Sequence, residues 1–423
     1  MSRYFWIPVF VNDRGSMDAS SSPLLQFQLN QSYRCVAYDA AHAAILSRAG
    51  EEAARAEIER WTGYSRTPLL ALPDLADELQ VAAIDYKDES GRFGLGSFKA
   101  LGGAYAVFRV LSSMIERATG SRPQAEDLIA GHHREITSAV TVTCATDGNH
   151  GRSVAWGARL FGSACVIYVH ATVSEQRVRA IEQFGARVNR TPGSYDDAVR
   201  RAAADAAAHS WIVVSDTSYP GYLEVPRHVM QGYSVMVEEA IVQMAERGRK
   251  ASHVFIQGGV GGLAAAVTAH FWESFGTEAP RVVVVEPDRA ACLFASAAAG
   301  FPTAVGGDLD TIMAGLACGE VSLLAWEILR DGAAAFMTIS DEAAIDVMRL
   351  LASGRAGASI VAGESGVAGL AGLRALADRT EWRRAIALDS ASTVLVFGTE
   401  GDTDPQLYRR LVGRSADEVR SQA

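Results

Sequence analysis

The feature of this sequence that most constrains its fold is an alternation of short β-rich runs with longer amphipathic stretches. Such an alternation is typical of βαβ units with parallel sheets. Predicted strands lie at 83–86, 140–144, 164–169, 187–190, 211–214, 253–257, 281–286, 336–339 and 393–397. Predicted helices lie at 98–117, 149–161, 174–184, 196–208, 224–247, 261–275, 289–298, 341–353 and 366–377. Several predicted strands are continuous apolar runs, which indicates sheets covered by helices on both faces.

The number of strands and the chain length set the expected organisation. Nine strands suggest two sheets rather than one, and 423 residues are enough for two or three domains. Residues 1–40 mix aromatic and Ser-rich pieces, and we expect a partly irregular extension packed on the body. Residues 40–61 have helical spacing, and the stretch 119–135 is predicted to be a polar surface insertion.

Charge and cysteine content exclude several classes of protein. The net charge is −10, so the chain is not expected to bind nucleic acid or an anionic membrane surface. No run approaches the roughly 20 apolar residues of a membrane-spanning helix, and the start lacks a signal-peptide pattern, so we expect a cytoplasmic protein. The five cysteines are scattered and form no Cys/His cluster. We therefore expect no disulfide framework and no metal site.

Lysine is unusually scarce. Only Lys87, Lys99 and Lys250 occur, whereas the other 36 basic residues are arginines. Arginine cannot replace an amine that must lose its proton and attack a carbonyl group. The three lysines are therefore candidates for chemistry that needs an amine.

The first candidate segment contains Lys99. It runs Phe93-Gly-Leu-Gly-Ser-Phe-Lys99, so a glycine-rich loop follows a predicted strand and Lys99 begins a helix. The positive end of the helix dipole disfavours an ammonium ion, so we expect a lowered pKa for Lys99. A neutral amine is what a Schiff base requires. The alternative is a solvated lysine on an exposed helix.

The second candidate segment is Cys144-Ala-Thr-Asp-Gly-Asn-His-Gly-Arg152, which again joins a predicted strand to a predicted helix. Exposed backbone amides at such a junction suit a carboxylate. Asp147, Asn149 and His150 add groups for acid–base chemistry and hydrogen bonding. The alternative is an ordinary turn, since Asp-Gly-Asn is common in turns.

The third candidate segment is Gln257-Gly-Gly-Val-Gly-Gly-Leu263, between a predicted strand and an Ala-rich helix. Glycines let backbone amides close on a phosphate, and the helix N-terminus favours the negative charge. The alternative is close helix–sheet packing. Together the three segments offer an amine, a carboxylate cradle and a phosphate cup at strand ends, where parallel sheets bind ligands. A small phosphorylated aldehyde held by a lysine is pyridoxal 5′-phosphate.

These segments resemble those of a known group of enzymes. Ser97-Phe98-Lys99 is similar to the cofactor-lysine segment of fold-type II pyridoxal-phosphate enzymes, which include the tryptophan synthase β-subunit. Five segments over about residues 60–405 resemble the diaminopropionate ammonia-lyase family in the expected order: 93–105, 146–152, 312–320, 363–366 and 399–404. Residues 1–40 and 119–135 lie outside this similarity. The resemblance implies an α/β fold of two domains, each with a mostly parallel twisted sheet flanked by helices. The expected division is an extension at 1–40, a large cofactor-binding domain at 41–103 and 211–423, and a small domain at 104–210.

The resemblance also implies roles for matching residues. Lys99 would form the Schiff base with pyridoxal 5′-phosphate, and Phe98 would lie against the cofactor. Asn149 would bind the 3′-oxygen. The phosphate would be bound by Gly258, Gly259, Val260, Gly261 and Gly262. The substrate carboxylate would be held by Thr146, Asp147, Gly148 and His150.

The implied reaction is elimination of ammonia from L- or D-2,3-diaminopropionate, which gives pyruvate and ammonia. Lys99 would remove the Cα proton from one face and Asp147 from the other, and Asp216 also falls on an active-site position of the family. The alternative is a related β-elimination or β-replacement on another β-substituted amino acid, as in serine and threonine dehydratases. The partner would be a small amino acid, and the family suggests a homodimer.

One detail departs from the family pattern. Fold-type II enzymes usually place a small hydroxyl or thiol near the pyridine nitrogen, at the position of Gly398, which has no side chain. The neighbouring Thr399 or a water would then serve instead. We also expect Cys292 and Cys318 to form a close pair near the site entrance.

Overall fold

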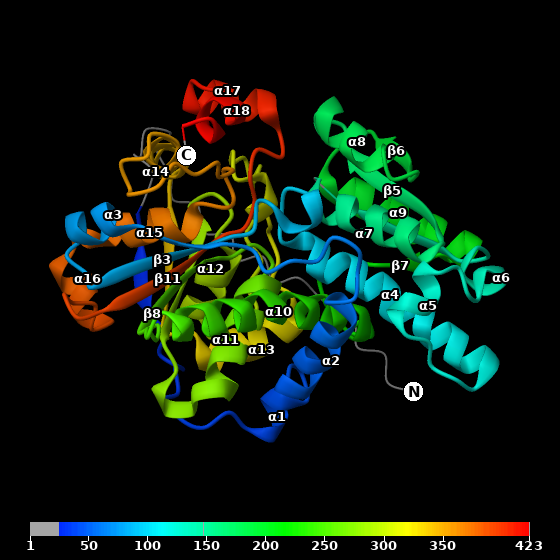
Figure 1. Ribbon diagram of the computed structural model, residues 1–423, viewed down its shortest axis with the longest axis horizontal. Coiled ribbons are helices and arrows are strands. Elements are labelled where there is room, and N and C mark those ends of the chain that lie inside the picture. The colour runs from blue at the N-terminus through cyan, green and yellow to red at the C-terminus, as the bar shows by residue number, and fades with distance from the viewer. Residues whose placement is uncertain (1–24, 147, 423) are drawn as a thin grey trace, which may run out of the picture.

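The computed structural model of the protein describes residues 25–146 and 148–422, which form two sheets covered by helices (Figure 1). The larger sheet has the strand order β1-β10-β9-β8-β11-β3-β2. Its strands are β1 (Phe27–Leu29), β2 (Leu69–Ala71), β3 (Ala83–Asp88), β8 (His253–Gln257), β9 (Arg281–Pro287), β10 (Ala335–Ile339) and β11 (Thr393–Gly398). The smaller sheet has the order β6-β5-β4-β7. Its strands are β4 (Thr141–Ala145), β5 (Ala164–His170), β6 (Arg187–Thr191) and β7 (Ile212–Val213).

All nine predicted strands are confirmed and correspond to β3 to β11. The predicted α/β class with two mostly parallel sheets is confirmed as well. The two strands that the sequence did not predict, β1 and β2, are three residues each and pair antiparallel at the two edges of the larger sheet. Three residues are too few to show a period of two, so hydropathy alone gives no sign of them.

The helices explain why the central strands are apolar on both faces. Val254, Ile256 and Val284 pack in one core with α10 (Glu224–Glu246) and α11 (Gly262–Phe275). Phe255 and Val283 point to the opposite face, into a core with α14 (Asp341–Ala352) and α15 (Ala368–Ala377). Because successive residues of a strand alternate between faces, burial of both faces requires an unbroken apolar run.

The remaining helices of the described residues complete these layers. Those nearest the smaller sheet are α4 (Lys99–Thr119), α5 (Ala125–Ile129), α6 (Arg134–Thr137), α7 (Asn149–Phe161), α8 (Glu175–Glu182) and α9 (Tyr195–His209). The others are α1 (Ala40–Ala43), α2 (Arg48–Ile58), α3 (Pro73–Glu78), α12 (Cys292–Ala299), α13 (Leu323–Gly332), α16 (Thr380–Ala385), α17 (Pro405–Val412) and α18 (Ala416–Arg420). Within the described ranges, none is long and apolar enough to cross a membrane.

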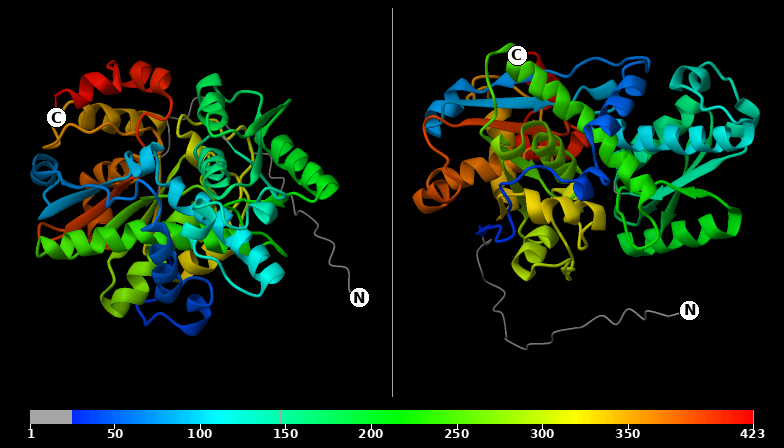
Figure 2. Two further views of the ribbon diagram at one scale, coloured as in Figure 1. Left: turned by 45° about the vertical axis from the view of Figure 1, so that its right-hand side comes forward. Right: turned by 90° about the horizontal axis from the view of Figure 1, so that it is seen from below.

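The two sheets lie in separate lobes, with α4 packed against both α7 and α10 (Figure 2). The strand β7 pairs with β4 of the smaller sheet. Residues 212–213 therefore belong with the smaller lobe, and the proposed domain boundary at 210/211 moves to a point after Val213. The rest of the proposed division stays a prediction.

Two segments outside the family resemblance are more ordered than expected. From residue 25 onward the N-terminal extension packs on the body, since β1 pairs with β10, while residues 1–24 lie outside the described residues. The stretch 119–135 is only partly a polar surface insertion. It contains α5, whose Ala125 and Leu128 are fully buried in the core.

Candidate active site

Lys99 is the first residue of α4 and follows a tight glycine loop. Gly94 and Gly96 of that loop have φ values of 69° and 73°, which residues with a side chain rarely adopt. The Lys99 ammonium donates a hydrogen bond from Nζ to Asp216 Oδ2 at 2.5 Å, and both side chains are 18% exposed. The rings of Phe98 and Tyr233 lie beside the amine, with centroids 5.4 and 5.7 Å from Nζ. The amine therefore lies in a partly closed, aromatic-walled site with one carboxylate.

The predicted lowering of the Lys99 pKa is wrong for the protein in this state. Burial lowers the pKa, but the charge of Asp216 outweighs burial and raises the pKa of Lys99 above its usual value. For Asp216, burial raises the pKa, and the nearby Lys99 and His150 outweigh burial and hold it below the usual range. The sequence could not reveal this pair, because the two residues are 117 positions apart.

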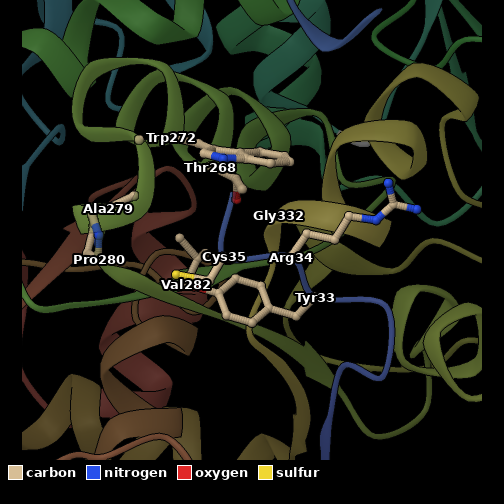
Figure 3. A pocket seen from close by; sticks show the side chains of 10 residues that line it. Tyr33, Arg34, Cys35, Thr268, Trp272, Ala279, Pro280, Val282 and Gly332 are labelled. Carbon is tan, nitrogen blue, oxygen red and sulfur yellow. The ribbon is translucent and has the colours of Figure 1, made fainter. Parts of the chain in front are cut away.

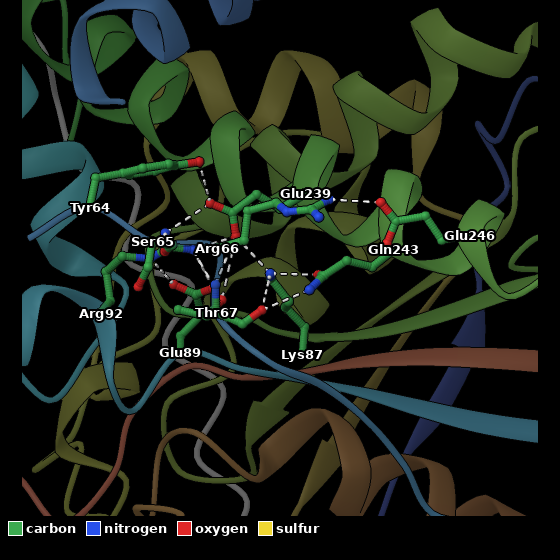
Figure 4. A network of polar contacts seen from close by, with 10 residues as sticks. All are labelled: Tyr64, Ser65, Arg66, Thr67, Lys87, Glu89, Arg92, Glu239, Gln243 and Glu246. Carbon is green, nitrogen blue, oxygen red and sulfur yellow. Dashed lines mark hydrogen bonds and ion pairs between the residues drawn. The ribbon is translucent and has the colours of Figure 1, made fainter. Parts of the chain in front are cut away.

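The other two lysines have different surroundings. Lys250 is on the surface and pairs with Glu278 at 2.9 Å. Lys87 is completely buried and donates to Glu239 at 2.7 Å, within a network of charged residues beneath the glycine loop (Figure 4). Lys87 is therefore already engaged by a carboxylate in the core, and Lys99 is the lysine that lies in a site.

The second predicted segment forms the junction between β4 and α7. The Thr146 hydroxyl accepts hydrogen bonds from the amides of Gly148 and Gly151 at 3.0 and 3.1 Å, so it caps the helix start. His150 is buried, and its Nε2 donates to the carbonyl of Val214 at 2.7 Å.

His150 also faces the Lys99 pair. Its Nδ1 lies 3.8 Å from Asp216 Oδ2 and has no hydrogen-bond partner among the described residues. Burial lowers the pKa of His150, which favours the neutral ring. Of the substrate cradle predicted at Thr146, Asp147, Gly148 and His150, Asp147 lies outside the described residues, and the structure brings His150 next to Asp216.

The third predicted segment forms a loop that ends at the first turn of α11. In the described part of the chain, no acceptor is found for the backbone amides of residues 259–262, as is usual for the first turn of a helix. Gly261 has φ of 98°, and a side chain there would press on Leu293, Ala325 and Leu329. A side-chain carbon on Gly262 would lie 3.7 Å from the carbonyl oxygen of Asp216. The glycine loop is therefore next to the Lys99–Asp216 pair.

Comparisons with known proteins agree with this geometry. The sequence profile of the family described as "Pyridoxal-phosphate dependent enzyme" matches residues 60–397. The diaminopropionate ammonia-lyase of Escherichia coli K12 is 40% identical over 373 residues, which cover 87% of this chain and 92% of that protein. The chain belongs to the pyridoxal-phosphate dependent enzymes and, within them, to the diaminopropionate ammonia-lyase family.

Solved structures support the same assignment. The holo diaminopropionate ammonia-lyase from E. coli has a TM-score of 0.84 and 38% identity, and the match covers 93% of this chain and 97% of that one. The E. coli enzyme in complex with D-serine has a TM-score of 0.84 and 37% identity, with 93% and 99% covered. The predicted family resemblance is confirmed.

The cofactor of this family is pyridoxal 5′-phosphate, and the residues present fit it. The free amides of residues 259–262 suit the phosphate, and the Lys99 amine suits the aldehyde. Asn149 is predicted to bind the 3′-oxygen of the cofactor. In the structure its Nδ2 donates a hydrogen bond to Glu400 Oε2 at 2.5 Å. Thr399 accepts a hydrogen bond from Gln257 at 2.6 Å, and its carbonyl accepts from the Phe98 amide at 3.0 Å. The roles of these residues toward the cofactor stay predictions.

The sequence analysis assigned no role to three residues near the site, which are Glu400, Glu364 and Arg177. Glu400 binds Asn149, and its second oxygen accepts from the amide of Ser365. Glu364 pairs with Arg177 of α8 at 2.9 Å. Glu364 and Glu400 lie in the segments 363–366 and 399–404 that carry the family resemblance, which was the available signal for them.

The two predicted cysteines lie at the glycine loop, and neither is in a disulfide bond. Cys292 Sγ is 3.5 Å from the carbonyl oxygen of Gly259, and Cys318 Sγ would lie 3.3 Å from a side-chain carbon on Gly259. They flank the loop without a disulfide between them.

Two cavities of the described residues lie away from this site. One, of about 10 Å³, fits about one water molecule at the end of α11 (Figure 3). The other, of about 390 Å³, is a hollow among α3, α14 and α15. None of the predicted site residues lines either cavity. No group of three or more His, Cys, Asp and Glu side chains in the described ranges is arranged to hold a metal ion.

Proposed function

We propose that this protein eliminates ammonia from 2,3-diaminopropionate and yields pyruvate and a second ammonia. The observation that carries the proposal is the Lys99 amine beside Asp216, next to a glycine loop that can bind a phosphate. The substrate follows from the relatives, since diaminopropionate ammonia-lyases are 38–40% identical to this chain over most of its length.

The chain's own residues supply the proton transfers. When bound, pyridoxal 5′-phosphate withdraws electrons from Cα of the substrate, so that the Cα proton can be removed. Lys99 Nζ can accept that proton once it is uncharged, and Asp216 Oδ2 can take it from Nζ across the 2.5 Å contact. Asp147 would accept the proton from the opposite face.

The departing amino group also needs a proton. An amine leaves as neutral ammonia only when it is protonated, so an acid must lie near Cβ. A proton held on the Lys99–Asp216 pair is available for this step. His150 would not donate to Asp216, because its ring proton is on Nε2, but its unpartnered Nδ1, 3.8 Å from Asp216 Oδ2, can accept a proton beside the pair.

The test is the ratio of products formed by the purified protein loaded with pyridoxal 5′-phosphate. With L- and D-2,3-diaminopropionate we expect two ammonia molecules per pyruvate. With serine, a single ammonia per pyruvate would form, because water is the other leaving molecule. No pyruvate from either enantiomer of 2,3-diaminopropionate would contradict the proposal.

A second candidate is β-elimination from another β-substituted amino acid. It is favoured by the E. coli enzyme's structure in complex with D-serine, which shows that a hydroxy amino acid can occupy a site of this family. Turnover of D-serine that greatly exceeds turnover of 2,3-diaminopropionate would favour this candidate.

We further propose that the protein acts as a cytoplasmic homodimer. Membership of this enzyme family supports the proposal. Light scattering behind size exclusion should give twice the 423-residue mass, and cell fractionation would test the location. A monomer that is fully active would contradict the assembly.

A further inference from the structure

Tyr86 carries a buried hydroxyl whose partner is missing from the described residues. Tyr86 lies in β3 and is 1% exposed, and its Oη forms no hydrogen bond with any described residue. A buried polar group without a partner costs about 1–3 kcal/mol, so native proteins rarely keep one without a role. The Tyr86 hydroxyl is therefore a candidate for a ligand contact.

The hydroxyl occupies the space of the missing side chain at Gly398. The strands β3 and β11 are parallel neighbours, and Tyr86 is opposite Val396, two residues before Gly398. A side-chain carbon built on Gly398 would overlap the Tyr86 hydroxyl and the adjacent ring carbon. The phenol thus leans toward the carboxyl end of β11, and only glycine at position 398 leaves room for it.

The end of β11 is part of the site. Thr399 follows Gly398, and its carbonyl binds the amide of Phe98, the residue before Lys99. Glu400, one residue further, binds Asn149. Burial, and then the charges of Asp88 and Glu400, raise the pKa of Tyr86 well above its usual value. The hydroxyl therefore keeps its proton and can donate it in a hydrogen bond.

We propose that the Tyr86 hydroxyl donates a hydrogen bond to the pyridine nitrogen of the cofactor, in the place that Gly398 leaves open. This rests on the proposed site, in which the glycine loop, Lys99 and Asn149 bind the phosphate, the aldehyde and the 3′-oxygen. The ring nitrogen is the polar group of the cofactor that those residues leave without a partner. A neutral donor leaves the nitrogen without a full positive charge, so it tunes how strongly the ring withdraws electrons.

The test uses pyridoxal 5′-phosphate labelled with ¹⁵N in the ring, bound to the full-length protein. Tyr86→Phe keeps the ring but removes the hydroxyl, so the ¹⁵N resonance of the bound cofactor should move away from its wild-type position. The dissociation constant of the cofactor should rise by about 2- to 10-fold, as expected for one lost hydrogen bond. The control is Tyr168→Phe, which removes the hydroxyl of another buried tyrosine, in β5 of the smaller sheet and not among the groups that act on Tyr86. Its resonance should match the wild type.

A second variant keeps the proposal testable if Tyr86→Phe does not fold. Gly398→Ala retains the phenol but pushes its hydroxyl aside, and it should move the ¹⁵N resonance as well. An unchanged resonance in both variants, or a change in Thr399→Val instead, would overturn the assignment to Tyr86. If the wild-type protein does not bind the cofactor, the proposed site itself is wrong.

Discussion

At the residue scale, the Lys99–Asp216 pair sets the protonation of the site. A salt bridge of 2.5 Å with 18% exposure keeps Lys99 charged until a ligand separates the two groups. The helix dipole that favours a neutral amine is a weaker influence than a carboxylate in contact. Lys99 must therefore pass a proton to Asp216 or to water before its amine can attack the cofactor aldehyde.

A substitution of Gly261 tests whether the glycine loop binds the phosphate of the cofactor. Gly261→Asp should raise the dissociation constant of pyridoxal 5′-phosphate at least about 10-fold, because the new side chain would press on Leu293, Ala325 and Leu329 and displace the loop amides from the phosphate. The control is Gly248→Asp. Gly248 has a positive φ of 66° and no neighbour within 4 Å of an added side-chain carbon. Gly248→Asp therefore introduces the same kind of backbone strain as Gly261→Asp, but outside the glycine loop. Equal cofactor affinity in wild type and Gly261→Asp would place the phosphate elsewhere.

A substitution of Asp147 tests whether Lys99 and Asp147 remove the Cα proton from opposite faces of the substrate. Asp147→Asn should lower turnover of one enantiomer of 2,3-diaminopropionate, expected to be D, by about 10²- to 10⁴-fold, the usual contribution of a general base. Turnover of the L-enantiomer, whose proton Lys99 removes, should fall much less. If Asp147 only caps the following helix, the variant would lose about 0.5–2 kcal/mol of stability and treat both enantiomers alike. Steady-state kinetics on the separate enantiomers distinguish the two outcomes.

At the element scale, a buried charge network holds the glycine loop that leads to Lys99. Glu239 of α10 accepts hydrogen bonds from Lys87 of β3 and from Arg92 of the loop, at 2.7 and 2.8 Å (Figure 4). Arg92 also binds Glu89. The network therefore links the strand, the loop and α10, and it fixes the direction in which α4 begins.

Removal of one charged group from this network should destabilise the folded protein. Glu239→Gln leaves two buried cations short of an acceptor charge and should lower the free energy of unfolding by about 3–5 kcal/mol. The adjacent Glu238, 21% exposed and paired with His270, is the matched control, and Glu238→Gln should cost no more than about 1 kcal/mol. Thermal unfolding of both variants measures the difference. Similar losses would mean that the network does not hold the loop.

The elements also show which features a sequence can reveal. The helix α7 and the strand β8 have the predicted bounds, because each has a long enough hydrophobic pattern and a clear turn on both sides. α13 (Leu323–Gly332) was not among the predicted helices, although Ser322 lies at its N-cap position. The contacts of Lys99, Asn149 and Gly398 were also missed, although Asp216 itself was predicted to be an active-site residue. Asp216, Glu400 and Tyr86 come from distant positions, and their contacts arise only when the strands assemble.

At the scale of the whole molecule, polar contacts join the two lobes across the site. Asn149 binds Glu400, Arg177 binds Glu364, and Ser174 of the α8 start donates to Asp404 at 3.0 Å. One partner in each pair follows a strand or begins a helix of the smaller lobe, and the other lies in the segments 363–366 and 399–404. The smaller lobe is thus held to the larger one through the start of α8 and through Asn149, the residue predicted to bind the cofactor.

Glu364 makes this junction sensitive to pH. Burial, and then the charge of Glu400, raise the pKa of Glu364 to about 7, although Arg177 opposes the shift. A folded pKa above the unfolded value means that the native state holds the extra proton between about pH 4.5 and about 7. The contribution of Glu364 to stability therefore falls as pH rises through that window and is constant above it.

Glu364→Gln should remove this dependence. The melting temperature of the variant relative to wild type should rise from pH 5 to pH 8, by an amount that corresponds to at most about 3 kcal/mol. Scanning calorimetry of both proteins at the two pH values measures it. Melting temperatures that differ by the same amount at both pH values would show that Glu364 does not titrate in this window.

Peptide mapping shows whether this fold binds pyridoxal 5′-phosphate through Lys99. Borohydride reduction of the loaded protein makes the bond between the lysine and the cofactor permanent, and mass spectrometry of the digest then locates it. We expect the phosphopyridoxyl group on Lys99, with Lys87 and Lys250 unmodified and with no covalent cofactor in Lys99→Ala. A cofactor on Lys87 or Lys250, or one retained covalently by Lys99→Ala, would contradict the account.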